Sequence, residues 1–291
     1  MQVLAFPDYC APAERLAATL SARFDLVGLH HFPDGESLVR LPAHLPEHVI
    51  LCRSLNHPND KLVELLLFAH TARELGARRI TLVAPYLCYM RQDIANHPGE
   101  AVSQRIVGQF LAGLFDDVIC VDPHLHRISN LHQAIPLANA TSVSAGPVIG
   151  DFLRERLSDA VLLGPDSESE QWVAEIAGDI GFDYAVANKV RRGDREVEIS
   201  LPAQNFSGRD VVIVDDMAST GRTMARAITL LRQAGAGAVY AAVTHPLFCA
   251  DAEACILAAG ADAIWSTDSI EHATACIRLD KLLASAVQAI L

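Results

Sequence analysis

Two adjacent acids followed by a loop of small residues form the part of this sequence best suited to bind a sugar phosphate. Asp215 and Asp216 follow an apolar run at 211–214, and the loop ASTGRT at 218–223 leads into a helical pattern. Backbone N–H groups and hydroxyls of such a loop, with the helix N-terminus, are suited to hold a phosphate. Two carboxylates can accept hydrogen bonds from the vicinal hydroxyls of a ribose. The segment therefore predicts a ribose phosphate site, and the alternative is an acid pair that only caps the helix.

Two other apolar runs end in residues that can bind a metal ion, His124 and Asp166. Sheets of α/β proteins place ligands at the carboxyl ends of their parallel strands, and a carboxylate oxygen there suits Mg²⁺. His124 equally fits a structural hydrogen bond, and its neighbour His126 competes with it as a ligand. Glu168 and Glu170, which follow Asp166, are expected to be solvated acids at a helix start.

A further apolar run, at 80–84, leads through a Pro-Tyr turn to Arg91, Gln92 and Asp93. An arginine at such a strand end can clamp a polyphosphate, and a glutamine can hydrogen bond to a base or a ribose. The segment predicts a nucleotide site. The alternative is a surface loop whose charges have no role.

The loop FPDGE at 32–36 is also suited to a nucleotide. Phe32 can stack on adenine, while Asp34 and Glu36 accept hydrogen bonds from its amino group, and Gly35 allows a tight turn. An exposed turn with a packed phenylalanine is the alternative.

Basic residues are concentrated in the segment 188–195 of a chain whose net charge is −12. They are Lys189, Arg191, Arg192 and Arg195, and Gly193 lies among them. The segment is flanked by strand-like sequence and predicts a flap that closes over anionic phosphates and excludes water. A solvated basic hairpin is the alternative.

The elements that must position these residues belong to the α/β class. Near-continuous apolar runs predict strands buried on both faces, as in a parallel sheet, at 49–52, 80–84, 118–121, 160–163, 211–214 and 239–243. Helical periodicity predicts helices between them, such as 60–75 and 223–234, the second closed by Gly235 as a C-cap.

The alternation of strands and helices occurs twice along the chain. The stretch TSVSAGPVIG at 141–150 is rich in small and polar residues and predicts a boundary there. We therefore expect an N-terminal domain at 1–143 and a C-terminal domain at 144–279. The last predicted helix, 280–291, has no strand of its own and is expected to pack on the first half.

Composition limits the class of protein. With 51% apolar and 20% charged residues, the chain of 291 residues is expected to be globular rather than disordered, collagen-like or coiled-coil. Its 23 basic against 35 acidic residues argue against nucleic acid or an anionic membrane as a partner.

Seven scattered cysteines without a CxxC pair argue against a disulfide framework or a zinc site, and they favour a reducing cytosol. The N-terminal sequence lacks a basic stretch followed by an apolar core, and no uninterrupted apolar run approaches the length of a membrane span. We expect a cytoplasmic protein without an export signal.

The segment VVIVDDMASTGRT at 211–223 resembles the ribose-phosphate-binding signature of the phosphoribosyltransferase-type fold. Further segments are similar, in the same order, to those of the ribose-phosphate pyrophosphokinase family, especially its shorter archaeal-like forms. These are FPDGE (32–36), PYLCYMRQD (85–93), PGEAVS (98–103), VDPH (121–124), GPD (164–166), NKVRRGDREVEI (188–199) and THPL (244–247). The resemblance covers most of the chain.

This resemblance implies two tandem phosphoribosyltransferase-like domains, each a mainly parallel sheet flanked by helices. It implies that the β,γ-diphosphoryl group of ATP is transferred to the C1 hydroxyl of ribose 5-phosphate, which gives phosphoribosyl pyrophosphate (PRPP) and AMP. ATP would bind on the N-terminal side and ribose 5-phosphate on the C-terminal side. A homo-oligomer of at least two chains is also implied, because this family takes the loop at 32–36 from a neighbouring subunit.

The resemblance also assigns residues to roles. It gives Mg²⁺ as the cofactor, with His124 helping to hold the ion that binds with ATP and Asp166 at the second metal position, and it gives Lys189 and Arg191 as the catalytic pair. ATP is assigned to Phe32, Asp34, Gly35, Glu36, Arg91, Gln92 and Asp93, and ribose 5-phosphate to Arg191, Asp215, Asp216, Ser219, Thr220, Gly221, Arg222 and Thr223.

Two residues depart from the family pattern. Arg222 stands where the family usually has glycine or alanine, and Ile94 stands where many members carry a basic residue. They leave open a catalytically impaired relative that regulates an active synthetase. An ordinary phosphoribosyltransferase that consumes PRPP is a third hypothesis, although it would not need the N-terminal segments.

Overall fold

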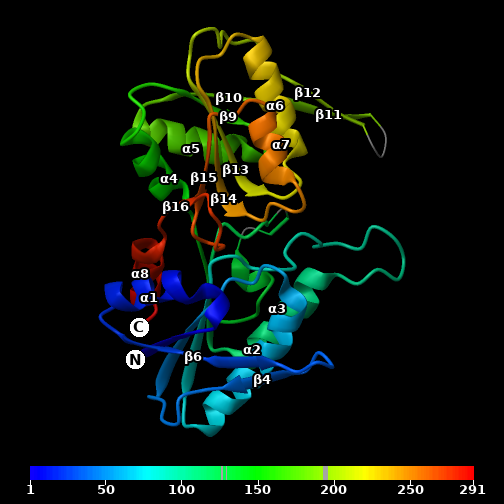
Figure 1. Ribbon diagram of the computed structural model, residues 1–291. Coiled ribbons are helices and arrows are strands. Elements are labelled where there is room, and N and C mark those ends of the chain that lie inside the picture. Colours follow the sequence, from blue (N-terminus) through cyan, green and yellow to red (C-terminus); the bar gives the residue numbers. More distant parts are fainter. Residues whose placement is uncertain (126, 129, 193–195) are drawn as a thin grey trace. The chain divides into compact units, whose positions relative to one another are not determined.

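The structure is a computed structural model that describes residues 1–125, 127–128, 130–192 and 196–291. His126, Gly193 and Arg195 lie outside the described residues, and so do the side chains of Gln171 and of residues 189–198. The chain forms two compact units (Figure 1). The first unit comprises residues 1–144, 269–271 and 279–291, and the second comprises residues 145–268 and 272–278.

The first unit is built on a six-stranded sheet in the order β2-β1-β5-β6-β7-β8, in which all neighbouring strands are parallel. The strands are β1 (Gln2–Ala5), β2 (Arg23–Leu26), β5 (His48–Cys52), β6 (Arg79–Ala84), β7 (Asp117–Val121) and β8 (Asn139–Val143). The helices are η1 (Pro7–Tyr9), α1 (Cys10–Thr19), α2 (Pro58–Glu74), α3 (Ser103–Leu114), η2 (Leu131–Gln133) and α8 (Asp280–Ala289).

Helices cover both faces of this sheet because its central strands are apolar on both sides. Leu51 and Leu82 of the sheet pack with Phe68 of α2 and Leu111 of α3 in one buried cluster. Helices α1 and α8 pack against each other, and α2 packs against α3 (Figure 1). The C-terminal helix α8 thus completes the unit that the N-terminal residues begin.

A separate antiparallel hairpin of the first unit carries the loop at 32–36. Its strands are β3 (Gly28–His31) and β4 (Ser37–Arg40), and His31 lies directly opposite Ser37. Leu29 and Val39 pack against the core of the unit, and β4 contacts α2.

The second unit repeats the architecture with the strand order β10-β9-β13-β14-β15-β16, again entirely parallel. The strands are β9 (Val161–Gly164), β10 (Asp183–Val186), β13 (Val211–Ala218), β14 (Val239–Pro246), β15 (Ala263–Thr267) and β16 (Ala275–Ile277). The helices are α4 (Gly146–Arg154), η3 (Ser167–Ser169), α5 (Glu170–Ile180), α6 (Arg222–Gln233) and α7 (Ala252–Ala258). Strands β11 (Asn188–Arg192) and β12 (Glu196–Ser200) form a two-stranded antiparallel ribbon.

The predicted α/β class with mainly parallel, helix-covered sheets is confirmed, and each of the predicted strands is present. Strands β13 and β14 extend four and three residues beyond their predicted ends. Asp215 pairs with Val243, and the pairing continues to Ala218 and Pro246. The acid pair therefore lies inside β13 rather than after it, because β14 extends alongside and satisfies the backbone of the polar residues.

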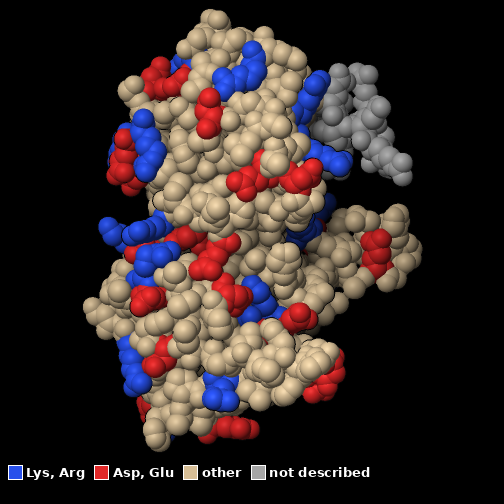
Figure 2. Space-filling model, viewed as in Figure 1, with Lys and Arg blue, Asp and Glu red and all other residues tan. Residues whose placement is uncertain are grey.

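On the face drawn in Figure 2, acidic and basic side chains are interspersed within each unit, without a continuous basic area. Among the described residues, no helix is both long and apolar enough to cross a membrane.

Candidate active site

The turn between β13 and α6 is the centre of the candidate site in the second unit. Gly221 has φ +67°, a left-handed conformation that strains other residues. A Cβ atom there would lie 2.9 Å from the carbonyl oxygen of Ala252. Glycine is thus required at this position both by backbone conformation and by the close approach of α7. The turn ends with the first-turn N–H groups of α6, which have no partner inside the helix and favour an anion.

Backbone hydrogen bonds hold the loop before Gly221 in place. Phe248 donates its N–H to the carbonyl oxygen of Ala218 at 2.9 Å, and Cys249 donates to that of Ser219 at 2.8 Å. Thr220 is exposed, whereas Ser219 and Thr223 are half-buried. Arg222 is exposed at the first position of α6, so its side chain does not fill the core behind the loop. The departure at Arg222 therefore leaves the turn geometry intact.

Three carboxylates of the second unit interact with one another. Burial raises the pKa of Asp215 well above its ordinary value, and the charges of Asp216 and Asp166 raise it further. The backbone N–H of Asp216 donates to Asp215 Oδ1 at 3.0 Å, which offsets only part of this effect. Asp166 caps η3 by accepting from the N–H of Glu168 at 3.1 Å. The side chain of Asp215 is thus poised to gain from a ligand that donates hydrogen bonds or carries positive charge.

These acids suit a hard cation, although they do not form a ready-made metal centre. Within the part of the chain that the structure describes, no group of three or more histidine, cysteine and acidic side chains has metal-binding geometry. Magnesium commonly takes only one or two protein carboxylates and completes its shell with water and phosphate oxygens. Asp166 fits that chemistry. His124, the other predicted metal ligand, is half-buried and follows β7 in the first unit.

The segment at 91–93 is held by neighbouring side chains and by α3. Arg127 Nη1 donates to Asp93 Oδ1 at 2.6 Å, and the Asp93 side chain is only 5% exposed. Ser103 Oγ donates to Gln92 Oε1 at 3.1 Å, while Arg91 is exposed. Asp93 is thus neutralised by a residue of the loop that also carries His124. The sequence analysis did not predict a role for Arg127. An acid beside a predicted polyphosphate site needs a positive partner, and that need could have pointed to this arginine.

The loop at 32–36 presents an aromatic ring to solvent. Phe32 donates its N–H to the carbonyl oxygen of Glu36 at 2.8 Å and accepts from the N–H of Gly35 at 2.9 Å. Asp34 Oδ1 accepts from the N–H of Glu36 at 3.2 Å, and Gly35 has φ +95°. Phe32 is 40% exposed, with the ring of His30 edge-on at 4.9 Å. An ordered loop with an exposed ring can stack on a planar base.

The predicted site residues therefore fall into two sets. The first unit holds the loop at 32–36, the segment at 91–93 and His124, and the second holds Asp166 and the residues of 215–223. Lys189 and Arg191 belong to β11, and the structure does not describe their side chains. Sequence reasoning also missed Arg53 and Glu64, a buried pair behind the loop at 32–36.

Known proteins share this architecture and sequence. The pattern that defines the N-terminal domain of ribose phosphate pyrophosphokinase matches residues 1–114, and that of the phosphoribosyl transferase domain matches residues 147–261. Ribose-phosphate pyrophosphokinase of Methanopyrus kandleri is 37% identical, with 99% of each chain covered. The protein of that name from Halobacterium salinarum is 32% identical over 94% of this chain and 96% of its own. The crystal structure of phosphoribosylpyrophosphate synthetase from Mycobacterium smegmatis has the same fold, with a TM-score of 0.84, 23% identity, and coverage of 99% of this chain and 98% of that one.

Proposed function

We propose that this chain, which belongs to the ribose-phosphate pyrophosphokinase family, makes PRPP and AMP from ATP and ribose 5-phosphate. The observation that carries the proposal is full-length similarity to that family together with an intact acid pair and glycine turn at 215–221. In the reaction, the C1 oxygen of ribose 5-phosphate forms a bond to the β-phosphorus of ATP. The bond from that phosphorus to the α,β-bridging oxygen breaks, AMP leaves, and the hydroxyl proton passes to water.

The turn after β13 binds the sugar phosphate in this proposal. The 5-phosphate accepts hydrogen bonds from the backbone of the turn, from the N-terminus of α6 and from the hydroxyls of Ser219, Thr220 and Thr223. The ribose 2- and 3-hydroxyls donate to Asp215, whose pKa is raised by burial and by the charges of Asp216 and Asp166, so donated hydrogen bonds favour its charged form. Asp216, Gly221 and Arg222 complete the ribose 5-phosphate site.

The first unit binds the nucleotide. Phe32 stacks on adenine, and Asp34 and Glu36 accept from its amino group, with Gly35 shaping the turn. Arg91 and Gln92 bind the polyphosphate and the ribose, while Asp93 holds their segment through Arg127. Ile94 is exposed beside them, so the departure there removes a surface charge without changing the Asp93 pair.

Lys189 and Arg191 are the catalytic pair in this proposal, and Arg191 also contacts ribose 5-phosphate. Diphosphoryl transfer needs positioning and stabilisation of spreading negative charge far more than covalent help. His124 would help to hold Mg²⁺ with ATP, and Asp166 would serve the second metal position; metal ions there would neutralise charge on the phosphates. The positive charges of Lys189 and Arg191 would stabilise the negative charge that develops on the leaving oxygen.

A homo-oligomer of at least two chains accompanies the proposal. Large apolar side chains of the first unit are exposed on the hairpin, on α2 and on α3, namely Leu38, Val63, Leu66, Leu67 and Ile106. Burial of such side chains against a second chain would stabilise an oligomer. Size-exclusion chromatography with light scattering tests this part, and a monomer at working concentration contradicts it. We also propose a cytoplasmic location, where both substrates are available.

The test of the function is an assay of the purified protein with ATP, ribose 5-phosphate and Mg²⁺ that follows AMP and PRPP together. Equal amounts of both products are expected. Lys189→Ala should reduce kcat by orders of magnitude and leave the circular dichroism spectrum unchanged. If ribose 5-phosphate binds without turnover, the regulatory subunit is the better hypothesis. If PRPP is consumed with a nucleobase and ATP does not bind, the chain is a phosphoribosyltransferase.

A further inference from the structure

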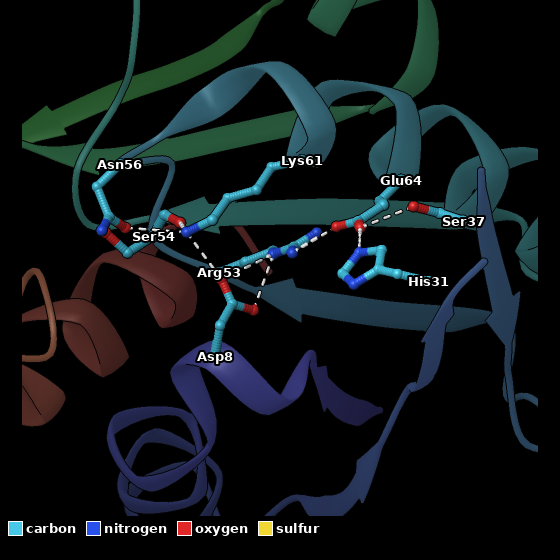
Figure 3. A network of polar contacts seen from close by, with 8 residues as sticks. All are labelled: Asp8, His31, Ser37, Arg53, Ser54, Asn56, Lys61 and Glu64. Atoms are coloured by element: carbon cyan, nitrogen blue, oxygen red, sulfur yellow. Dashed lines mark hydrogen bonds and ion pairs between the residues drawn. The ribbon is translucent and has the colours of Figure 1, made fainter. Parts of the chain in front are cut away.

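A buried ion pair lies directly behind the hairpin that carries the loop at 32–36. Arg53, at the end of β5, donates from Nη2 to Glu64 Oε2 of α2 at 2.6 Å (Figure 3). Their side chains are only 2% and 1% exposed. Charges so completely removed from water are costly unless each one is paired and hydrogen bonded. The pair therefore needs a reason beyond the packing of the core.

The second oxygen of Glu64 reaches the hairpin. Oε1 lies 2.8 Å from His31 Nε2 and accepts from Ser37 Oγ at 3.1 Å (Figure 3). An ionised carboxylate only accepts hydrogen bonds, so His31 donates from Nε2. Burial alone would raise the pKa of Glu64, but the hydrogen bonds from His31, Arg53 and Ser37 outweigh it and lower the pKa. Glu64 is thus a carboxylate held in its charged form.

These two partners occupy a particular place in the hairpin. His31 and Ser37 face each other as the last residue pair before the loop. One oxygen atom of Glu64 therefore bridges both ends of the segment 32–36. An isolated two-stranded hairpin is marginally stable, and Leu29 and Val39 anchor only its body to the core. Glu64 is the polar anchor at the loop end.

The other side of Arg53 fixes the pair to the rest of the first unit. Arg53 Nε donates to Asp8 Oδ1 at 3.1 Å, and its guanidinium lies 3.8 Å above the ring of Phe6. Lys61 of α2 pairs with the same Asp8 at 2.7 Å and donates to the carbonyl oxygen of Ser54 at 2.8 Å. The guanidinium thus lies between two carboxylates and a ring, and these contacts tie Glu64 to the rest of the first unit.

We propose that Glu64 is a positioning residue for ATP, because it clamps both ends of the loop at 32–36 and so orders the ring of Phe32 and its neighbouring acids before the nucleotide arrives. The inference rests on the proposed function in one respect, namely that this loop binds the nucleotide. A loop that is ordered beforehand spares the nucleotide the entropy of ordering it, so the clamp acts on ATP affinity and not on ribose 5-phosphate.

The cleanest test removes the clamp and keeps the buried pair. The double variant His31→Ala, Ser37→Ala leaves Arg53 and Glu64 together, whereas Glu64→Ala would strand the Arg53 charge and risk unfolding. We expect the KM for ATP to rise about tenfold, with the KM for ribose 5-phosphate within about twofold of the original value. The double variant His31→Ala, Ser37→Thr keeps a hydroxyl at position 37, so its KM for ATP should rise less than that of the double alanine variant. His70→Ala is the matched control, because His70 is exposed on α2 outside this network.

Amide hydrogen exchange gives a readout that does not need turnover. In the double variant, exchange should accelerate at residues 32–36 and stay unchanged in β5, β6 and β7. Equal increases in both KM values with a lower Tm would overturn the inference, because they indicate a merely structural role. Faster exchange with an unchanged KM for ATP would also overturn it. If the wild type makes no PRPP, the proposed function fails, and the clamp is then tested by direct ATP binding to wild type and variant.

Discussion

Glu64 in the first unit is a buried carboxylate and Asp215 in the second a half-buried one, and their surroundings shift their pKa values in opposite directions. Arg53, His31 and Ser37 surround Glu64 with donors and lower its pKa. Asp215 faces two further acids, and its pKa is raised. A carboxylate whose charge is satisfied by its own chain supports the fold. A carboxylate whose pKa is raised by its own surroundings gains stability from a ligand that donates hydrogen bonds or carries positive charge, as proposed for Asp215.

Removing the satisfied acid should have the largest effect. Glu64→Ala leaves the Arg53 guanidinium buried beside Asp8 alone, and we expect the free energy of unfolding to fall by about 3–5 kcal/mol. Urea denaturation measures this loss. Glu74→Gln, an exposed acid at the end of the same helix, is the control. A loss of unfolding free energy below about 1 kcal/mol would mean that Asp8 alone is a sufficient partner for Arg53. Glu64 would then not be a structural acid, which contradicts the comparison.

Removing the unsatisfied acid should affect binding instead of stability. Asp215→Asn replaces one of the two carboxylate oxygens proposed to accept from the ribose hydroxyls with an NH2 donor and removes the negative charge. We expect kcat/KM for ribose 5-phosphate to fall about 100-fold, or about 2.7 kcal/mol. The free energy of unfolding should stay equal or rise, because the repulsion from Asp216 and Asp166 is relieved. Glu170→Gln, at the exposed start of α5, is the control. A variant that unfolds more easily would contradict this assignment.

The pH dependence of stability should have opposite signs for the two acids. The pKa of folded Glu64 lies below its ordinary 4.5, so its contribution is present above that pH and is lost as the pH falls through the folded pKa. The pKa of folded Asp215 lies above its ordinary 3.8, so its contribution is present below that pH and is lost as the pH rises through the folded pKa.

Urea titrations of Glu64→Gln and Asp215→Asn across this range test the two signs. Relative to wild type, Asp215→Asn should gain stability as the pH rises towards neutrality, with a slope of at most about 1.4 kcal/mol per pH unit. The deficit of Glu64→Gln should shrink as the pH falls below 4.5. If the stability of both variants relative to wild type changed with pH in the same direction, the proposed difference between Glu64 and Asp215 would be wrong.

The smallest effect is expected at Asp93, a largely buried acid whose partner Arg127 is mostly exposed. Arg127→Ala removes the 2.6 Å hydrogen bond to Asp93 and loosens the segment at 91–93. We expect the KM for ATP to rise about three- to fivefold, which corresponds to about 1 kcal/mol. Arg105→Ala, an exposed arginine on α3, serves as the control in the same kinetic assay. An unchanged KM for ATP would show that this pair has no part in nucleotide binding.

The sequence predicted the elements whose own residues determine them. Apolar runs such as 161–163 and 239–243 can only be buried strands, and Gly235 ends α6 with φ +75° as expected. Strand β2 escaped notice because its exposed, charged sequence has no apolar run, and its place is decided by pairing with β1. The extension of β13 to Ala218 likewise depends on a neighbouring strand and is invisible in the local pattern.

The site residues divide in the same way, into those that the local sequence reveals and those that depend on distant partners. The turn at 218–223 is local, so its glycine and hydroxyls could be read from their order. Glu64 meets Arg53 across 11 residues and His31 across 33, and such partners become visible only when the chain has folded. The roles of the individual site residues stay predictions, and the variants above are the means to test them.

The place of α8 has a consequence for the order in which the protein can fold during synthesis. The first unit includes residues 279–291, and Arg79 of β6 donates to the carbonyl oxygen of Ile290 at 2.7 Å. A ribosome delivers the sheet of that unit long before it delivers the helix that covers α1. Most of the second unit is contiguous and emerges meanwhile, so it can fold first, whereas the half that begins the chain must wait with apolar surface uncovered.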